Sequence, residues 1–231
     1  MTNENRLLAS LPKAEYKRLA SVLEQVQLTF GEVLYEADET IDFVYFPENS
    51  IISLISPMSA RSTIEVGMVG NEGMVGLSVF MGVDNSLTRA IVQGSGSAMR
   101  LSSAAMRQES NRLSFFHHLL HRYSHSILAQ VSQSSACNRF HSVNTRLARW
   151  LMMTSDRLGA DEFRLTQEFM SSMLGVRREG LNKAAGALQT EKMIHYSRGM
   201  ITILDRDLLE DSACQCYSII KAESDEYLNH Q

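Results

Sequence analysis

The stretch "LTQEFMSSMLGVRREGLNKAAGALQ", residues 165–189, contains two short helical patterns that meet at Gly175. Thr166 is a typical helix N-cap residue, so we expect the first helix to begin at Gln167. Gly175 suits the left-handed backbone of a tight turn, and the small and apolar residues around it would fill the wedge between two crossing helices. This spacing predicts a helix-turn-helix.

The second helix of this stretch is expected to expose a polar face near its start. Its inward positions are Leu181, Ala184, Ala185 and Leu188, and its outward positions are Arg178, Glu179, Asn182 and Lys183. Arginine and lysine suit guanine or phosphate, and glutamate suits cytosine. The N-terminal part of a recognition helix is the part that enters the major groove. The face therefore favours DNA reading, with two alternatives: a solvated charged surface, or a wedge for a protein partner.

A hairpin is predicted directly after these helices. The segment KMIHYSRGMITILD, residues 192–205, has two β runs around Ser197-Arg198-Gly199. Such a hairpin would be the wing of a winged helix, and Arg198 at its tip would meet a phosphate.

The rest of the chain alternates between helical and strand-like texture. Residues 6–24 predict short helices around Pro12, and short β-branched or aromatic runs separated by turns fill residues 25–101. Runs of this length and spacing predict an antiparallel barrel or sandwich. From there to about residue 190 the pattern is helical, which makes the predicted fold class α+β.

A long helix is expected over residues 112–134, followed by an amphipathic helix over 143–158. The apolar seam of the long helix approximates a heptad repeat and consists of Leu113, Phe116, Leu120, Tyr123, Ile127 and Val131. A helix with such a stripe must pack on its own domain or on a copy of itself. We interpret the seam as a dimer interface.

Composition and charge narrow the class of protein. With 231 residues the chain is expected to form two domains, and its net charge of −4 is uneven. Residues 140–204 carry +3 and residues 205–231 carry −5, so the positive stretch contains the predicted helix-turn-helix. There is no apolar run of membrane-spanning length and no pattern of a signal peptide near the start. Three scattered cysteines do not make a disulfide framework. A soluble cytoplasmic protein is expected.

The order of these elements resembles that of a known family. A β-roll, a long helix, a second helix, a helix-turn-helix and a wing are similar to the cyclic-AMP receptor protein and fumarate–nitrate regulator (Crp/Fnr) superfamily of bacterial transcription factors. The segments "FGEVLYEADE", "GMVGLSVFMG" and "LTQEFMSSMLGVRREGLNKAAGAL" carry the resemblance, which covers nearly the whole chain.

The resemblance implies an organisation and partners. It implies a β-roll sensor over residues 1–111, a dimerisation helix over 112–139, and a winged helix-turn-helix domain with an acidic tail over 140–231. It also implies a homodimer that binds a palindromic site in double-stranded DNA, with RNA polymerase as a further partner.

The resemblance also assigns roles to the polar residues of the helix-turn-helix. By position, Arg178, Glu179 and Lys183 match the places that read bases. Thr166, Gln167 and Arg177 lie near the contacts to the DNA backbone. With Asn182 and Arg198, these residues form the predicted DNA-binding set.

The sensor half departs from the cyclic-nucleotide binders of the family. Those proteins use a Gly-Glu pair for the ribose and an Arg-Ser pair for the cyclic phosphate, whereas this chain has Gly76-Leu77 and Thr88-Arg89 at these places. Because the ribose carboxylate is missing, we expect an effector other than cyclic AMP, or none. A cyclic-nucleotide switch with an altered pocket is the alternative. The predicted effector pocket consists of Gly76, Leu77, Thr88 and Arg89.

Metal and catalytic chemistry find little support in the sequence. An iron–sulfur cluster needs about four cysteine ligands, and this chain has Cys137, Cys214 and Cys216, all distant from the amino terminus. Cys214 and Cys216 are compatible with a weak thiol or metal pair that has its third ligand elsewhere in the chain, but we favour two small, partly buried residues of a carboxy-terminal helix. The histidines of the long helix recur every four residues without a nearby carboxylate or cysteine, which favours a polar flank of a helix pair; they are His117, His121 and His125, with His118 beside them.

We find no phosphate-binding loop and no GxSxG motif, and the three glycines of "GMVGNEG", residues 67–73, have the wrong spacing for a dinucleotide fold. We therefore predict a protein that is not an enzyme, with no metal and no cofactor.

Overall fold

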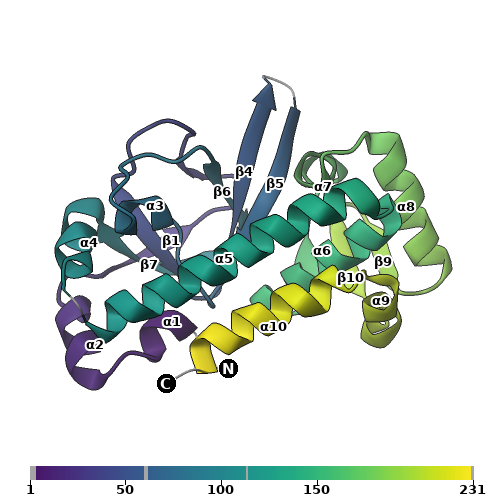
Figure 1. Cartoon of the computed structure of the whole chain (residues 1–231). Coiled ribbons are helices and arrows are strands. Elements are labelled where there is room, and N and C mark those ends of the chain that lie inside the picture. Colours follow the sequence, from purple (N-terminus) through teal and green to yellow (C-terminus); the bar gives the residue numbers. More distant parts are fainter. Residues whose placement is uncertain (1–3, 60–61, 113, 230–231) are drawn as a thin grey trace.

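The computed structural model describes residues 4–59, 62–112 and 114–229. A β-roll at the amino-terminal end is followed by one long helix and a helical domain with a small sheet (Figure 1). Among the described residues, none of the helices combines the length and the apolar character needed to span a membrane.

Seven strands in two antiparallel sheets build the roll. Their orders are β1-β7-β3 and β2-β6-β4-β5, which confirms the predicted antiparallel β architecture. The strands are β1 (Glu24–Leu28), β2 (Val33–Tyr35), β3 (Phe43–Pro47), β4 (Ile51–Ser59), β5 (Ser62–Val69), β6 (Arg89–Gly94) and β7 (Gly96–Ser102). Four short helices accompany them, namely α1 (Arg6–Ala9), α2 (Lys13–Ala20), α3 (Leu77–Phe80) and α4 (Ser103–Ser110).

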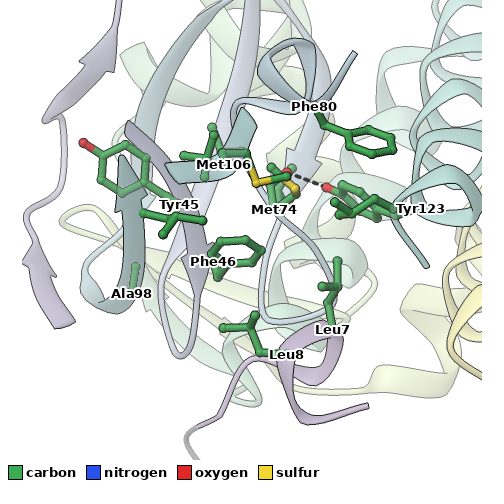
Figure 2. Close-up of a cluster of buried hydrophobic side chains, with 14 of the residues drawn as sticks. Leu7, Leu8, Tyr45, Phe46, Met74, Phe80, Ala98, Met106 and Tyr123 are labelled. Atoms are coloured by element: carbon green, nitrogen blue, oxygen red, sulfur yellow. Dashed lines mark hydrogen bonds between the residues drawn. The ribbon is translucent and has the colours of Figure 1, made fainter. Parts of the chain in front are cut away.

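The core of the roll includes side chains of the long helix α5 (Phe115–Phe140). Figure 2 shows Tyr123 of α5 beside Met74, with Phe46 of β3 and Leu7 of α1 in the same cluster. The Tyr123 hydroxyl donates to the carbonyl oxygen of Met74 at 2.7 Å. Its ring leaves no room for a Cβ at Gly73, which would lie 2.5 Å from the ring. The first half of α5 is therefore fixed to its own roll.

This packing corrects part of the predicted dimer interface. Phe116, Leu120 and Tyr123 are at most 1% exposed in the single chain, so assigning them to an interface with a second copy was wrong. Their side chains belong to the core of the roll because this face of α5 packs against it. Ile127 and Val131 are half-buried, and Leu113 lies outside the described residues.

The carboxy-terminal half combines helices with a three-stranded antiparallel sheet of order β8-β10-β9. Its elements are α6 (Val143–Leu158), β8 (Glu162–Arg164), α7 (Gln167–Leu174), α8 (Arg178–Thr190), β9 (Ile194–Ser197), β10 (Met200–Ile203), α9 (Arg206–Ser212) and α10 (Cys216–Asn229). The expectation of helix from about residue 101 to about residue 190 was wrong at β8, because a strand of three residues is too short to show a period. Helix α10 runs alongside α5 (Figure 1), so the acidic tail packs on the fold.

Buried contacts join the roll to the carboxy-terminal half. Ile51, Ile55 and Met68 of the roll share one apolar cluster with Trp150 of α6. Three polar contacts accompany this cluster. They are Glu72–Arg157 at 2.8 Å, Gln93–Thr154 at 2.9 Å and Trp150–Glu65 at 2.9 Å.

The Glu65 carboxyl is the most unusual group in this junction. Burial raises its pKa from 4.5 to about 7. Hydrogen bonds with Ser53 and Trp150 and the charges of Arg149 and Arg157 oppose this rise without cancelling it. One carboxyl oxygen, Oε2, is buried and has no hydrogen-bond partner among the described residues. The protonated form therefore fits the site better than the ionised form.

Replacing Glu65 by glutamine is expected to remove a pH dependence of stability. In the native protein the folded state keeps a proton that the unfolded state loses, so the free energy of unfolding falls as pH rises from about 4.5 to about 7. Above that window the penalty is constant, at most about 3 kcal/mol for a shift of this size. Glutamine keeps the acceptor for Trp150 and does not ionise, so the variant should be the more stable protein at pH 8.

Urea unfolding of both proteins at pH 5 and pH 8 measures this difference. A stability difference between them that is the same at both pH values would contradict the assignment.

Candidate DNA-binding surface and sensor pocket

Helices α7 and α8 form the predicted helix-turn-helix. The hydroxyl of Thr166 accepts the backbone N–H of Phe169 at 3.1 Å, and α7 begins at Gln167 as expected. Gly175 ends α7 in the left-handed conformation, with φ of 62°. A guanidinium N–H of Arg146 on α6 donates to the carbonyl oxygen of Leu174, which secures the turn to the rest of the domain.

The two faces of α8 also agree with the sequence prediction. The four inward residues are at most 5% exposed and hold α8 against its domain; they are Leu181, Ala184, Ala185 and Leu188. Every residue of the predicted DNA-binding set is exposed: Thr166, Gln167, Arg177, Arg178, Glu179, Asn182, Lys183 and Arg198. The first two turns of α8 thus present two cations, an acid and an amide to solvent: Arg178, Lys183, Glu179 and Asn182.

One ion pair links the two helices across this surface. A guanidinium nitrogen of Arg178 lies 3.0 Å from a carboxylate oxygen of Glu168 on α7. Both side chains are mostly exposed, and such surface pairs contribute less than about 1 kcal/mol. Arg178 can therefore exchange Glu168 for another partner at little cost. The sequence alone did not connect Glu168 with Arg178.

The wing ends in a tight turn that exposes its arginine. Arg198 and Gly199 have φ of 52° and 79°, the signature of a two-residue hairpin turn with both central residues in the left-handed region. Strand β8 adds Arg164, which pairs in register with Met200 of β10 and is exposed. Sequence reasoning missed Arg164 because the strand that carries it was not recognised. The wing region therefore has two exposed arginines.

In the roll, Gly76 and Thr88 meet at the side chain of Tyr35. The Tyr35 hydroxyl forms hydrogen bonds with the Gly76 backbone and with the side chains of Ser86 and Thr88. Burial raises the pKa of this phenol to about 12, so Tyr35 is a neutral hydroxyl. Leu77 is half-buried and packs against the roll core. A polar group of the protein itself thus occupies the space between Gly76 and Thr88.

Arg89 is paired within the chain. Its guanidinium lies 3.3 Å from a carboxylate oxygen of Glu36. An acidic side chain therefore lies beside the one cation of the predicted pocket.

The histidines of α5 do not converge on one point. His117 and His121 approach each other at 3.0 Å between their Nε2 atoms, and both rings meet the edge of Phe80. His125 instead pairs with Glu223 of α10 at 3.4 Å. Within the described part of the chain, His117 and His121 belong to no group of three or more potential metal ligands.

Comparison with known proteins adds a family to this geometry. Residues 145–212 match a protein family described as the Crp-like helix-turn-helix domain. No curated protein sequence matches the chain.

Solved structures resemble the chain over most of its length. A transcriptional regulator of the Crp/Fnr family from Eubacterium rectale has 20% identity and a TM-score of 0.66, with 90% of this chain and 99% of that chain covered. FixK2 from Bradyrhizobium japonicum has 15% identity and a TM-score of 0.71, covering 84% and 98%. The c-di-GMP-responsive regulator CLP of Xanthomonas campestris has 14% identity and a TM-score of 0.66, covering 83% and 99%.

At these identities the structures establish the fold, and the domain match establishes the helix-turn-helix. Residues 145–212 therefore form a Crp-like helix-turn-helix domain, and the chain shares the fold of Crp/Fnr-type regulators over most of its length.

Proposed function

We propose that this regulator acts as a homodimer that reads a palindromic DNA site with the amino-terminal half of α8. The observation that carries this proposal is the exposure of the polar α8 residues above a buried apolar face. Two such helices related by a dimer axis would enter successive major grooves, about 34 Å apart.

The exposed residues divide into readers and positioning contacts. Arg178 and Lys183 would donate to guanine or phosphate, and Glu179 would accept from cytosine. Asn182 would pair with adenine in the same groove. The remaining residues of the set lie at the edges of this face and would bind phosphates, which position the protein without reading sequence. They are Thr166, Gln167, Arg177 and Arg198.

The dimer face would be the solvent side of α5. Its centre is Leu128, which is 63% exposed and faces away from the roll. At spacings of three and four residues on the same side lie Ser124, Val131 and Ser135. A large apolar side chain among small neighbours lets two helices approach closely along this stripe.

The effector of the roll has another chemistry than a cyclic nucleotide, or is absent. The CLP regulator responds to c-di-GMP, and the geometry around Tyr35 and Arg89 gives no support for carrying this response over to the present chain. An effector would act by favouring one arrangement of the two α8 helices in the dimer. This requires that the effector bind the two arrangements with different affinities. We also propose RNA polymerase as a partner at the promoters it regulates, without assigning a surface to that contact.

Selection from a random DNA pool by the purified protein tests the proposal. At about physiological salt and without added ligand, we expect enrichment of a two-fold symmetric site with half-sites one helical turn apart. Enrichment of a single asymmetric half-site would contradict the homodimer, and no enrichment even in the presence of cell extract would contradict the reading function.

A further inference from the structure

Three cysteines and one histidine that are far apart in the sequence meet at one point of the fold. Cys137 lies near the end of α5, and His141 directly follows that helix. Cys214 lies between α9 and α10, and Cys216 is the first residue of α10. The three cysteines are at most 8% exposed and form a small cluster of their own, with all three thiols free.

The four ligand atoms lie close enough together to surround a single metal ion, and two of their spacings are near those of a tetrahedral site. All four atoms lie within 4.8 Å of one another. The Sγ atoms of Cys137 and Cys214 are 3.5 Å apart, and Cys216 Sγ is 3.5 Å from Nδ1 of His141. Zn–S bonds of about 2.3 Å and Zn–N bonds of about 2.0 Å place two ligands of a tetrahedron about 3.8 Å apart for two sulfurs and about 3.6 Å apart for sulfur and nitrogen.

The surroundings of the cluster suit negatively charged sulfur. The side-chain amide of Gln133 donates to Cys216 Sγ at 3.1 Å, as hydrogen-bond donors around a metal site do for the thiolates that bind the metal. Arg146 and Arg149 of α6 are buried and within electrostatic range of Cys137. The Nε atoms of both arginines are buried without a hydrogen-bond partner among the described residues. Buried cations of this kind need a nearby negative charge.

We propose that Cys137, His141, Cys214 and Cys216 form a closed site for one Zn²⁺ ion. Three thiolates and one imidazole are a typical ligand set of structural zinc, and thiolates select against Mg²⁺ and Ca²⁺. On binding, the three thiols release their protons to solvent, and the neutral imidazole coordinates through Nδ1. The site then carries a net charge of −1 opposite the two buried arginines.

A disulfide explains the cluster less well. A bond between Cys137 and Cys214 would use two of the four groups and would leave Cys216 and His141 side by side without a role. It would also require the two sulfurs to move from 3.5 Å to about 2.05 Å. The sequence favoured a structural role for Cys214 and Cys216 and left open a metal pair with a third ligand elsewhere in the chain. The fold brings Cys137 and His141 to this position.

The position of the site gives it a structural consequence that does not depend on the proposed DNA target. Its ligands come from α5, from the connection between α5 and α6, and from the segment leading into α10. A bound ion would therefore fasten α10 to α5 and fix the connection through which the long helix enters the carboxy-terminal half. Removal of the ion should loosen this connection first.

Cobalt titration of reduced protein, purified without oxygen and stripped of metal, tests the site directly. We expect one Co²⁺ per chain, with the visible bands of tetrahedral cobalt and the near-ultraviolet bands of thiolate ligation. Zn²⁺ should displace the cobalt and raise the Tm, because an ion that binds only the folded state stabilises it. The variant Cys216→Ser should weaken binding at least about 100-fold, whereas His118→Ala, which changes an exposed histidine outside the site, should not alter it.

Two further variants test the site if Cys216→Ser fails to fold. His141→Ala changes a half-buried residue, and Gln133→Ala removes only the hydrogen-bond donor to Cys216 Sγ, so the circular dichroism of both should stay native. Gln133→Ala is expected to weaken metal binding by about 10- to 100-fold. Native protein that binds neither ion, or cobalt spectra that are the same in Cys216→Ser, would overturn the proposal. Recovery of a Cys137–Cys214 disulfide from protein prepared without oxidant would also overturn it.

Discussion

Replacing both Arg178 and Lys183 by alanine is expected to weaken specific DNA binding by at least about 100-fold. Both side chains are exposed on the first turns of α8, where a recognition helix meets base edges. A good contact from an arginine or a lysine to a base contributes about 1–3 kcal/mol, and a dimer loses each contact twice. Because two cations per chain no longer neutralise phosphates or base acceptors, the dependence of affinity on salt should also become shallower.

Fluorescence anisotropy with the selected palindrome at several salt concentrations measures both effects. The control is Lys13→Ala combined with Lys17→Ala, which removes two exposed cations from α2 in the roll and changes the net charge equally. If the control loses as much affinity as the α8 variant, the effect is one of total charge and α8 is not the reading helix. Native circular dichroism of the variant excludes a folding defect, since neither side chain is buried.

Replacing Leu128 by arginine is expected to convert the dimer to monomers. Leu128 is 63% exposed on α5, and in a symmetric pair each copy would face its counterpart near the axis. An arginine there would place two like charges together and remove the apolar contact. Loss of the dimer also separates the two reading heads, so the affinity for the full palindrome should fall about 100-fold or more, towards that of a half-site.

Light scattering after size-exclusion chromatography gives the oligomeric state, and anisotropy with full and half sites gives the affinities. Leu87→Arg, at an 81% exposed position of the roll, is the matched control for the same chemical change. A Leu128→Arg protein that stays dimeric and keeps its affinity would move the interface away from this face of α5. The two variants separate the proposals, since the α8 variant should remain a dimer.

The helix-turn-helix and its wing could be read from the sequence because local signals specify them. Thr166 caps a helix through its own hydroxyl, and Gly175 adopts a backbone that other residues resist. The turn at Arg198 and Gly199 likewise depends on two adjacent residues. The strands of the roll were predicted for the same reason, since turn residues mark the two ends of each short apolar run. Four of the predicted DNA-binding residues could be chosen because the inward face of α8 left them outside: Arg178, Glu179, Asn182 and Lys183.

Other features depended on which surfaces meet, and these the tertiary structure decided. The apolar seam on α5 was visible in the sequence, but only the roll showed that Phe116, Leu120 and Tyr123 face inward and leave Leu128 outside. A helical period gives a stripe and does not name its partner.

The raised pKa of Glu65 is another feature that only the tertiary structure decided. Its sequence neighbours do not reveal that α6 covers it and that Trp150 donates to it.

The cluster of Cys137, His141, Cys214 and Cys216 is the clearest case of this division. His141 and Cys214 lie 73 positions apart in the sequence, and no local pattern links the two ends of that interval. Only the return of α10 along α5 brings the four ligand atoms within 4.8 Å of one another. The sequence by itself determined the helix-turn-helix and the wing turn, because their caps and turns are set by contacts between residues close in sequence. The buried junction, the outward face of α5 and the metal-ligand cluster were decided by long-range packing, because burial and proximity are properties of the whole fold.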